Sequence, residues 1–171
     1  MCIRDSPGSA VLAAIEGTRP VLVEVQALVA STSFATPRRA VVGWDSARLA
    51  MILAVLEARC GLSFSDCDVY LNIAGGLRVQ EPGADLAIAA ALVSALTGYV
   101  IPSDTVFFGE IGLAGEIRPT MQMDLRLKEA TKLGFKQSVC PANPNKKKEY
   151  PKGAAPIKHI NDLVSLSLIH I

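Results

Sequence analysis

The apolar residues near the start of the chain fall into two runs, residues 9–15 and 20–29, which are rich in Val, Leu and Ala. A turn-like stretch, Glu16-Gly17-Thr18-Arg19-Pro20, separates the two runs. From Val23 onward the second run alternates apolar and polar residues, which is typical of a half-buried strand. The pattern predicts a β-hairpin. A loop of small polar residues, 31–37, then leads into a short third strand over residues 38–43.

A first helix is predicted directly after this strand. Asp45 or Ser46 can accept a hydrogen bond from a free N–H of the first turn, and Gly61 is a typical residue to end the helix. Between them the apolar residues recur at helical spacing, at Leu49, Ile52, Leu53 and Leu56.

The rest of the chain alternates strands and helices. The predicted strands cover residues 68–73, 106–112, 116–118 and 138–140, and the predicted helices cover residues 82–96 and 121–133, with a last strand and helical turn in residues 157–165. The helix that begins at Pro82 is almost entirely apolar, so we expect it at the centre of the molecule. This order predicts an α/β fold of the α+β sandwich type, in which helices pack on a mixed sheet.

Composition excludes several classes of protein. The chain has 171 residues, of which 50% are hydrophobic and 19% charged, and its net charge is +1, so it is neither a disordered tail nor a polybasic protein. Aromatic residues make up only 5%, which argues against a platform that stacks single-stranded bases. The longest apolar run, residues 86–101, is shorter than the roughly 20 residues of a membrane span, and the N-terminus lacks the apolar region of a signal peptide. We therefore expect a cytoplasmic protein without a membrane segment.

The two ends of the chain are related through the genetic code. One back-translation of the first six residues, MCIRDS, is the reverse complement of a word that encodes the last six, LSLIHI. The word resembles a transposon end used in sequencing libraries. We therefore expect residues 1–6 and 166–171 to be translated adapter sequence, residues 7–165 to form one domain, and the chain to be a fragment of a longer protein.

Residues for common catalytic or binding sites are scarce. Only two histidines occur, so a Ser-His-Asp triad cannot be built, and His159 is predicted to be structural. The cysteines at positions 2, 60, 67 and 140 form no C-x-x-C pair, and we expect reduced thiols without a metal. The phosphate-binding motif G-x-x-x-x-G-K-[ST] is absent, so no residue here is expected to bind ATP.

Three segments in a fixed order carry a family resemblance. They are residues 75–92 (GGLRVQEPGADLAIAAAL), 108–119 (FGEIGLAGEIRP) and 126–135 (RLKEATKLGF), and residues 16–29 match as well. The chain resembles the C-terminal, Lon-protease-like domain of the RadA (Sms) family of bacterial DNA repair proteins. The resemblance covers residues 7–165 and implies the fold of the Lon proteolytic domain.

Lon proteases use a Ser-Lys dyad, in which the lysine removes the serine proton. The resemblance puts Gly83 at the position of the serine and Asp124 at that of the lysine. Glycine has no nucleophile and a carboxylate cannot replace the amine, so we expect no catalytic residue and no enzyme activity in this fragment. Two alternatives remain open: a Lon-class Ser-Lys peptidase domain, and the Lon-like domain of a magnesium-chelatase-related competence ATPase.

The RadA resemblance implies the remaining expectations. The parent protein would be a DNA-dependent ATPase and helicase that acts in branch migration during homologous recombination. Its ATP/Mg and Zn sites would lie upstream of this chain, its subunits would form a ring, expected to be a hexamer, and its DNA would be single-stranded or branched. If this domain contacts DNA phosphates, the basic residues best placed in the sequence are Arg38, Arg39, Lys146, Lys147 and Lys148.

Overall fold

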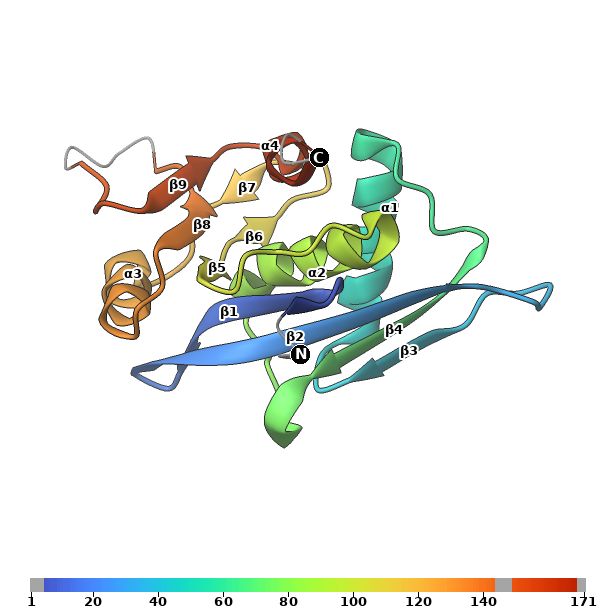
Figure 1. The fold of residues 1–171 in the computed structure, drawn as a ribbon, viewed down its shortest axis with the longest axis horizontal. Coiled ribbons are helices and arrows are strands. Elements are labelled where there is room, and N and C mark those ends of the chain that lie inside the picture. Colours follow the sequence, from blue (N-terminus) through green and yellow to red (C-terminus); the bar gives the residue numbers. More distant parts are fainter. Residues whose placement is uncertain (1–4, 144–148, 169–171) are drawn as a thin grey trace.

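The computed structural model describes residues 5–143 and 149–168 and shows a mixed sheet packed with four helices (Figure 1). Seven strands form this sheet in the order β3-β4-β2-β1-β5-β8-β9, and β6 and β7 form a separate pair. The strands are β1 Ser9–Glu16, β2 Arg19–Ser31, β3 Arg39–Val42, β4 Cys67–Ile73, β5 Thr105–Phe107, β6 Glu110–Ile111, β7 Ile117–Arg118, β8 Gln137–Pro141 and β9 Ala154–Ile157. The helices are α1 Ser46–Cys60, α2 Asp85–Thr97, α3 Met123–Lys132 and α4 Ile160–Leu168. The predicted fold class is confirmed.

The predicted hairpin is the centre of the sheet. Strands β1 and β2 pair antiparallel from Ser9 opposite Gln26 to Glu16 opposite Arg19. The far half of β2 pairs antiparallel with β4, and β4 pairs parallel with the edge strand β3. On the other side, β1 pairs with β5 only through Val11 and Leu12, so the end of β1 extends past its neighbour.

Helix α2 lies in the middle of the molecule, as its apolar sequence predicts. It packs on β1 and β2 and is covered on its other side by β6 and α4 (Figure 1). All residues from Asp85 to Ser94 are buried, so the one carboxylate in this stretch must be neutralised inside the protein. Helix α1 begins and ends as predicted, because the Asp45 side chain accepts from the backbone N–H of Arg48 and Gly61 adopts a left-handed conformation.

Several predicted boundaries are wrong, among them that of the last strand, which covers Ala154–Ile157 and not part of residues 157–165, and two others are wrong for identifiable reasons. The predicted strand over residues 106–112 is split between the large sheet and the β6-β7 pair, because Gly109 leaves the sheet to bind the start of α2. Its N–H donates to the Gly83 carbonyl at 2.8 Å, and its carbonyl accepts from Leu86 N at 3.0 Å. Helix α3 begins two residues later than predicted, because Gln122 precedes it in a left-handed conformation.

The predicted structural role of His159 is confirmed. Its Nε2 lies 2.9 Å from the Ala114 carbonyl oxygen, which fixes the turn between β6 and β7. At the end of the chain, α4 continues through Leu168, so the first three residues of the predicted adapter segment 166–171 lie in this helix.

Candidate functional site

Gly83 is buried in a short 3-10 turn, Pro82–Ala84, directly before α2. A β-carbon added to Gly83 would lie 3.0 Å from Glu81 Oε2, 3.2 Å from Thr120 Cγ2 and 3.5 Å from Arg126 Nη1. These are the three nearest atoms, and none belongs to Asp124, which is exposed in the first turn of α3. The cation beside the expected nucleophile position is therefore Arg126, a residue that sequence reasoning did not assign to the site.

Arg126 and Glu81 form a closely packed ion pair at this position. The Arg126 side chain is 2% exposed, and both of its terminal nitrogens donate to the Glu81 carboxylate. Its Nε also donates to the Met121 carbonyl at 3.0 Å, and its guanidinium lies 5.6 Å from the centre of the Phe108 ring. An arginine stays protonated at any physiological pH, so Arg126 cannot remove a proton from a nucleophile.

The same ion pair closes the free edge of β1. Beyond Leu12, where the pairing with β5 stops, Arg126 Nη1 donates to the Ala13 carbonyl at 2.7 Å and Glu81 Oε1 accepts from Ile15 N at 2.9 Å. Two side chains thus satisfy backbone groups that a neighbouring strand would otherwise bind. Thr120 also lies beside Gly83, and its Oγ1 is buried without a hydrogen-bond partner among the described residues.

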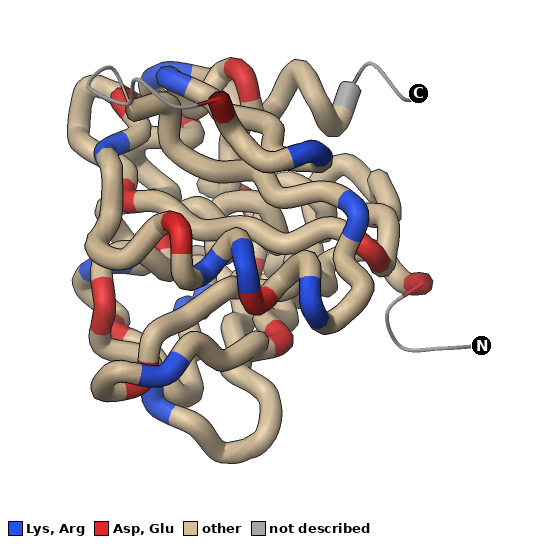
Figure 2. Tube along the Cα trace, turned by 90° about the vertical axis from the view of Figure 1, so that its left-hand side faces the viewer, with Lys and Arg blue, Asp and Glu red and all other residues tan. Residues whose placement is uncertain are grey.

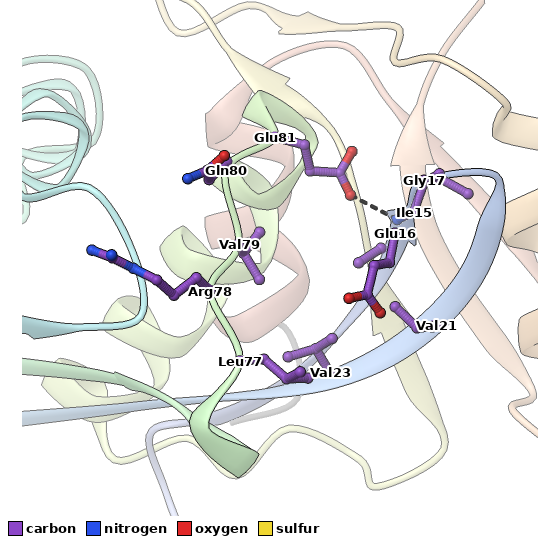
Figure 3. Close-up of a pocket in the computed structure, with 11 residues that line it drawn as sticks. Ile15, Glu16, Gly17, Val21, Val23, Leu77, Arg78, Val79, Gln80 and Glu81 are labelled. Atoms are coloured by element: carbon purple, nitrogen blue, oxygen red, sulfur yellow. Dashed lines mark hydrogen bonds between the residues drawn. The ribbon is translucent and has the colours of Figure 1, made fainter.

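A cleft of about 370 Å³ opens next to this pair, which is within the size range of small ligand pockets (Figure 3). One side is the end of the β1–β2 hairpin, with Val21 and Val23, and the other is the extended segment 77–81. The Glu81 carboxylate points across the cleft to Ile15, and Glu16 extends over it from the hairpin (Figure 3). The Arg78 side chain points away from the cleft, toward the loop that precedes α1.

The structure places Arg38 and Arg39 at the start of the edge strand β3 and gives them different roles. Arg39 donates to the carbonyls of Phe64, Cys67 and Arg38, so its guanidinium holds the loop before β4 against β3. The Arg38 guanidinium lies 4.0 Å above the Phe34 ring, and its backbone N–H donates to Asp68 Oδ1 at 2.7 Å. Lys146, Lys147 and Lys148 lie outside the described residues.

A second buried pair, Arg48 with Asp85, lies at the other end of β3 and was also missed from the sequence. Asp85 is 0% exposed, and it accepts from Arg48 Nε at 2.9 Å, from Arg48 Nη2 and from Ile111 N at 3.0 Å. Burial raises the pKa of Asp85, while the hydrogen bonds from Arg48 and Ile111 act against that rise. In return, the Asp85 carboxylate raises the pKa of Arg48. A signal was present in the sequence, because a carboxylate within an apolar, buried helix requires a charged partner.

Arg48 and Arg78 line one cavity of about 420 Å³ together with Gln80 and the loop residues Gly43, Trp44 and Asp45. The Arg48 side chain is 29% exposed, so it reaches this cavity while Asp85 fixes its orientation. Arg78 is exposed and forms no ion pair or side-chain hydrogen bond with any described residue. The ends of β3 therefore carry four arginines, of which Arg38 and Arg78 are the least constrained.

The described parts of the chain contain neither a cluster of metal ligands nor a helix that could span a membrane. No three His, Cys, Asp or Glu side chains there are grouped so that they could hold a metal ion. Among the helices formed by these residues, none has the length and apolar character needed to cross a membrane.

Comparison with known proteins assigns the chain to a family. The sequence model described as subunit ChlI of Mg-chelatase matches residues 24–144, which is more than half of the chain. The chain belongs to the ChlI family. Its matched region contains the second part of the hairpin strand β2, both ion pairs and the glycine at position 83.

This ChlI-family chain is also similar to several curated proteins that are named DNA repair protein RadA. It is 63% identical over 136 residues to RadA of Brucella abortus, a match that covers 80% of this chain and 29% of that protein. It is 48% identical over 157 residues to RadA of Rickettsia felis, a match that covers 92% of this chain and 35% of that protein. It is 53% identical over 134 residues to RadA of a Synechocystis species, a match that covers 78% of this chain and 26% of that protein. The resemblance to the Lon-like domain of RadA is confirmed, and the chain spans about a third of the length of these relatives.

Proposed function

We propose that this chain is a non-proteolytic, Lon-like domain of a RadA-type DNA repair protein and that it contacts DNA through phosphate groups. Its similarity to proteins named DNA repair protein RadA supports the assignment to DNA repair. The observation that carries the phosphate contact is the set of arginines at the two ends of β3.

The geometry of this edge suits a duplex. From Arg38 to Gly43 the chain advances five residues at about 3.3 Å each, or about 16 Å, and the cavity with Arg48 and Arg78 begins at Gly43. A DNA duplex carries one charge per about 1.7 Å of its axis, so a contact of this length passes about nine phosphate charges. Arg38 and Arg78 can therefore bind different phosphates of the same duplex.

The distribution of charged residues on the other elements favours a DNA contact that is confined to the ends of β3. Among the described residues, the Lys and Arg positions are interspersed with Asp and Glu positions in Figure 2, so these residues form no broad cluster of positive charge there. Several exposed cations on other elements are neutralised by neighbours, such as Lys136 by Asp104 and Arg118 by Glu116. Binding through phosphates alone would not distinguish DNA sequences.

The activities expected of the longer protein belong to the same proposal. ATP hydrolysis with Mg, zinc binding, branch migration and assembly into a hexameric ring would be functions of the complete RadA-type protein. Within it, this domain would serve as a scaffold that guides DNA without cleaving peptide bonds.

The test is fluorescence anisotropy of the chain with a labelled duplex of about 20 base pairs over a series of salt concentrations. Each phosphate contact contributes about −0.9 to the slope of log affinity against log salt. We expect Arg38→Ala and Arg78→Ala each to flatten the slope by about that amount, equally for unrelated sequences, and the double variant by about twice as much.

The matched control is Lys132→Ala on α3, which also removes one exposed positive charge. It should leave the slope unchanged. Arg39→Ala is a second comparison, because it should lower stability by freeing the loop before β4. Equal slopes for the unsubstituted chain, the Arg38→Ala variant and the Arg78→Ala variant would remove β3 from the DNA contact.

A further inference from the structure

The large sheet ends in two edge strands, β3 and β9, and the outer edge of β9 is closed. Ser138 N donates to the Gly153 carbonyl at 2.9 Å, so the odd-numbered residues of this parallel pair face β8. Of the two residues that face outward, Ala154 donates its N–H to the Pro151 carbonyl at 3.1 Å, and Pro156 has no N–H. The four residues of β9 therefore offer a further strand no free N–H.

The outer edge of β3 is open by the same analysis. Val69 N donates to the Arg38 carbonyl at 2.9 Å, so the even-numbered residues at this edge pair with β4. The backbone groups of Arg39 and Val41 then point away from the sheet. Outside the β3–β4 ladder, no hydrogen bond among the described residues uses the backbone of either residue.

The next odd-numbered residue, Gly43, shows the direction of these groups. Its carbonyl accepts from the N–H of Val79, which lies outside the sheet, at 2.9 Å. The fold thus already places a donor from another segment at this edge, one position beyond Val41. The N–H and carbonyl groups of Arg39 and Val41 form an unpaired row of the kind that an added strand binds.

A groove of about 270 Å³ lies between this edge and α1. Arg39 and Val41 both line it, so a strand added beside them would direct alternate side chains into it. Its buried lining is apolar and is formed by Leu49, Leu53 and Phe64. Its exposed lining on α1 is small at three positions spaced four residues apart, Ser46, Ala50 and Ala54. The groove therefore has room and apolar surface for aliphatic side chains.

The exposed charges at the groove favour an acidic ligand. The guanidinium of Arg39 binds only carbonyl oxygens, and neither Arg39 nor Arg38 forms an ion pair with any described residue. Asp68, which interacts with both arginines, is buried. Glu57 is the one carboxylate that lines the groove. Two exposed cations thus stand against one exposed carboxylate.

We propose that the outer edge of β3 binds an extended peptide segment of a partner protein, which adds a strand beside Arg39 and Val41. Aliphatic side chains of the segment enter the groove against Leu49 and Leu53, and an acidic side chain lies near the two arginines at the start of β3. The inference does not rest on the proposed DNA contact. A duplex that passes along β3 would use the same edge, so the two ligands would exclude each other.

The test is fluorescence anisotropy of the full chain with a fluorescein-labelled peptide, Asp-Leu-Val-Leu-Val, in the absence of DNA. A second peptide, Lys-Leu-Val-Leu-Val, reverses its charge. A third carries N-methyl groups on the three central amides of the first and so lacks the N–H groups for strand pairing. We expect saturable binding of the acidic peptide, weaker binding of the lysine peptide and no binding of the methylated peptide.

Two substitutions probe the backbone edge and the groove. Val41→Pro removes an outward N–H without breaking the ladder to β4 and should weaken binding about three- to tenfold, whereas Val41→Ala keeps that N–H and should lose less. Ala50→Phe fills the groove and should abolish saturable binding. Its matched control, Ala47→Phe, lies on an exposed position of α1 outside the groove lining and should bind normally. Circular dichroism and thermal unfolding confirm that each variant is folded.

The outcomes separate this proposal from its rivals. Absence of saturable binding, equal binding of all three peptides, or binding that is indifferent to both Val41→Pro and Ala50→Phe would overturn the peptide site. Sedimentation velocity tests the second copy as occupant: a dimer of the unsubstituted chain that Val41→Pro dissolves would also overturn it. Arg78→Ala should weaken duplex binding and leave peptide binding unchanged, because Arg78 does not line the groove. Failure of the DNA contact would therefore leave the peptide result intact.

Discussion

Glu81 and Arg126 meet beside Gly83, and between them they bind the two backbone groups that the end of β1 leaves open at Ala13 and Ile15. One ion pair therefore performs two tasks. It fills the space next to the position where a Lon-type nucleophile would stand, and it protects an unpaired strand end from pairing with another chain.

The first prediction concerns proteolysis. Gly83→Ser should fold, since its β-carbon would require neighbouring side chains to move by only a few tenths of an ångström. The variant should nevertheless cleave neither casein nor a fluorogenic peptide, because Arg126 cannot act as a base and Asp124 is not an amine. The measurement is peptide release that co-elutes with the purified protein, and the unsubstituted chain is the control. Activity in Gly83→Ser alone would show that another base serves the site.

The second prediction concerns the ion pair itself. Arg126→Met keeps the bulk of the side chain but leaves the Ala13 carbonyl without its donor and the Glu81 carboxylate without its cation. Removing one member of a buried pair should lower the free energy of unfolding by about 3–5 kcal/mol. Urea denaturation followed by circular dichroism measures this change. Lys132→Met is the control, because its ion pair with Glu129 is exposed and should be worth less than about 1 kcal/mol.

Most of the scaffold could be predicted from the sequence, because its signals are local. The hairpin follows from alternation around a turn, α1 from Asp45 and Gly61, and the central position of α2 from its uninterrupted apolar residues. The exceptions depend on contacts between distant residues. Gly109 ends its strand because it binds Gly83 and Leu86, which no pattern within residues 106–112 reveals.

The site was harder to predict for the same reason. Alignment to the Lon pattern assigned Asp124 to the base position, but folding brings Arg126 next to Gly83, two residues further along α3. Arg39 is adjacent to Arg38 and has the same charge, yet three backbone carbonyls bind its guanidinium. Which charges are structural is decided by the tertiary partners that each one finds.

The third prediction concerns Thr120, whose buried Oγ1 makes no hydrogen bond among the described residues. Thr120→Val has nearly the same shape and removes a hydroxyl that gains nothing from its surroundings. Since an unsatisfied buried polar group costs about 1–3 kcal/mol, the variant should be as stable as the original chain or up to about that much more stable. Thermal unfolding checks this, with Thr131→Val as the contrast, because Thr131 Oγ1 donates to the Leu127 carbonyl at 2.9 Å. A clear loss of stability in Thr120→Val would mean that the hydroxyl has a partner.

The last prediction concerns the pH dependence of the loop that carries Arg38. Asp68 Oδ1 accepts from Arg38 N, and this hydrogen bond lowers the pKa of the Asp68 carboxyl below its usual range. A carboxyl whose pKa is lower in the folded than in the unfolded chain binds fewer protons when folded, so it stabilises the fold above the unfolded value of about 3.9. That contribution is lost as the pH falls through the lower, folded-state pKa.

Asp68→Asn should therefore lower the urea midpoint at pH 7, and the difference from the original chain should shrink as the pH falls below about 4. Asp66→Asn is the matched control, because Asp66 is exposed in the turn directly before β4, and its printed contact with the described residues is through its backbone carbonyl, which accepts from Thr32 N at 3.0 Å. A difference between the original chain and Asp68→Asn that stays constant from pH 7 to about pH 3 would mean that the hydrogen bond does not depend on the charge of Asp68. Since Asp68 fixes the backbone at Arg38, Asp68→Asn should also weaken the proposed DNA contact at neutral pH without changing the number of arginines.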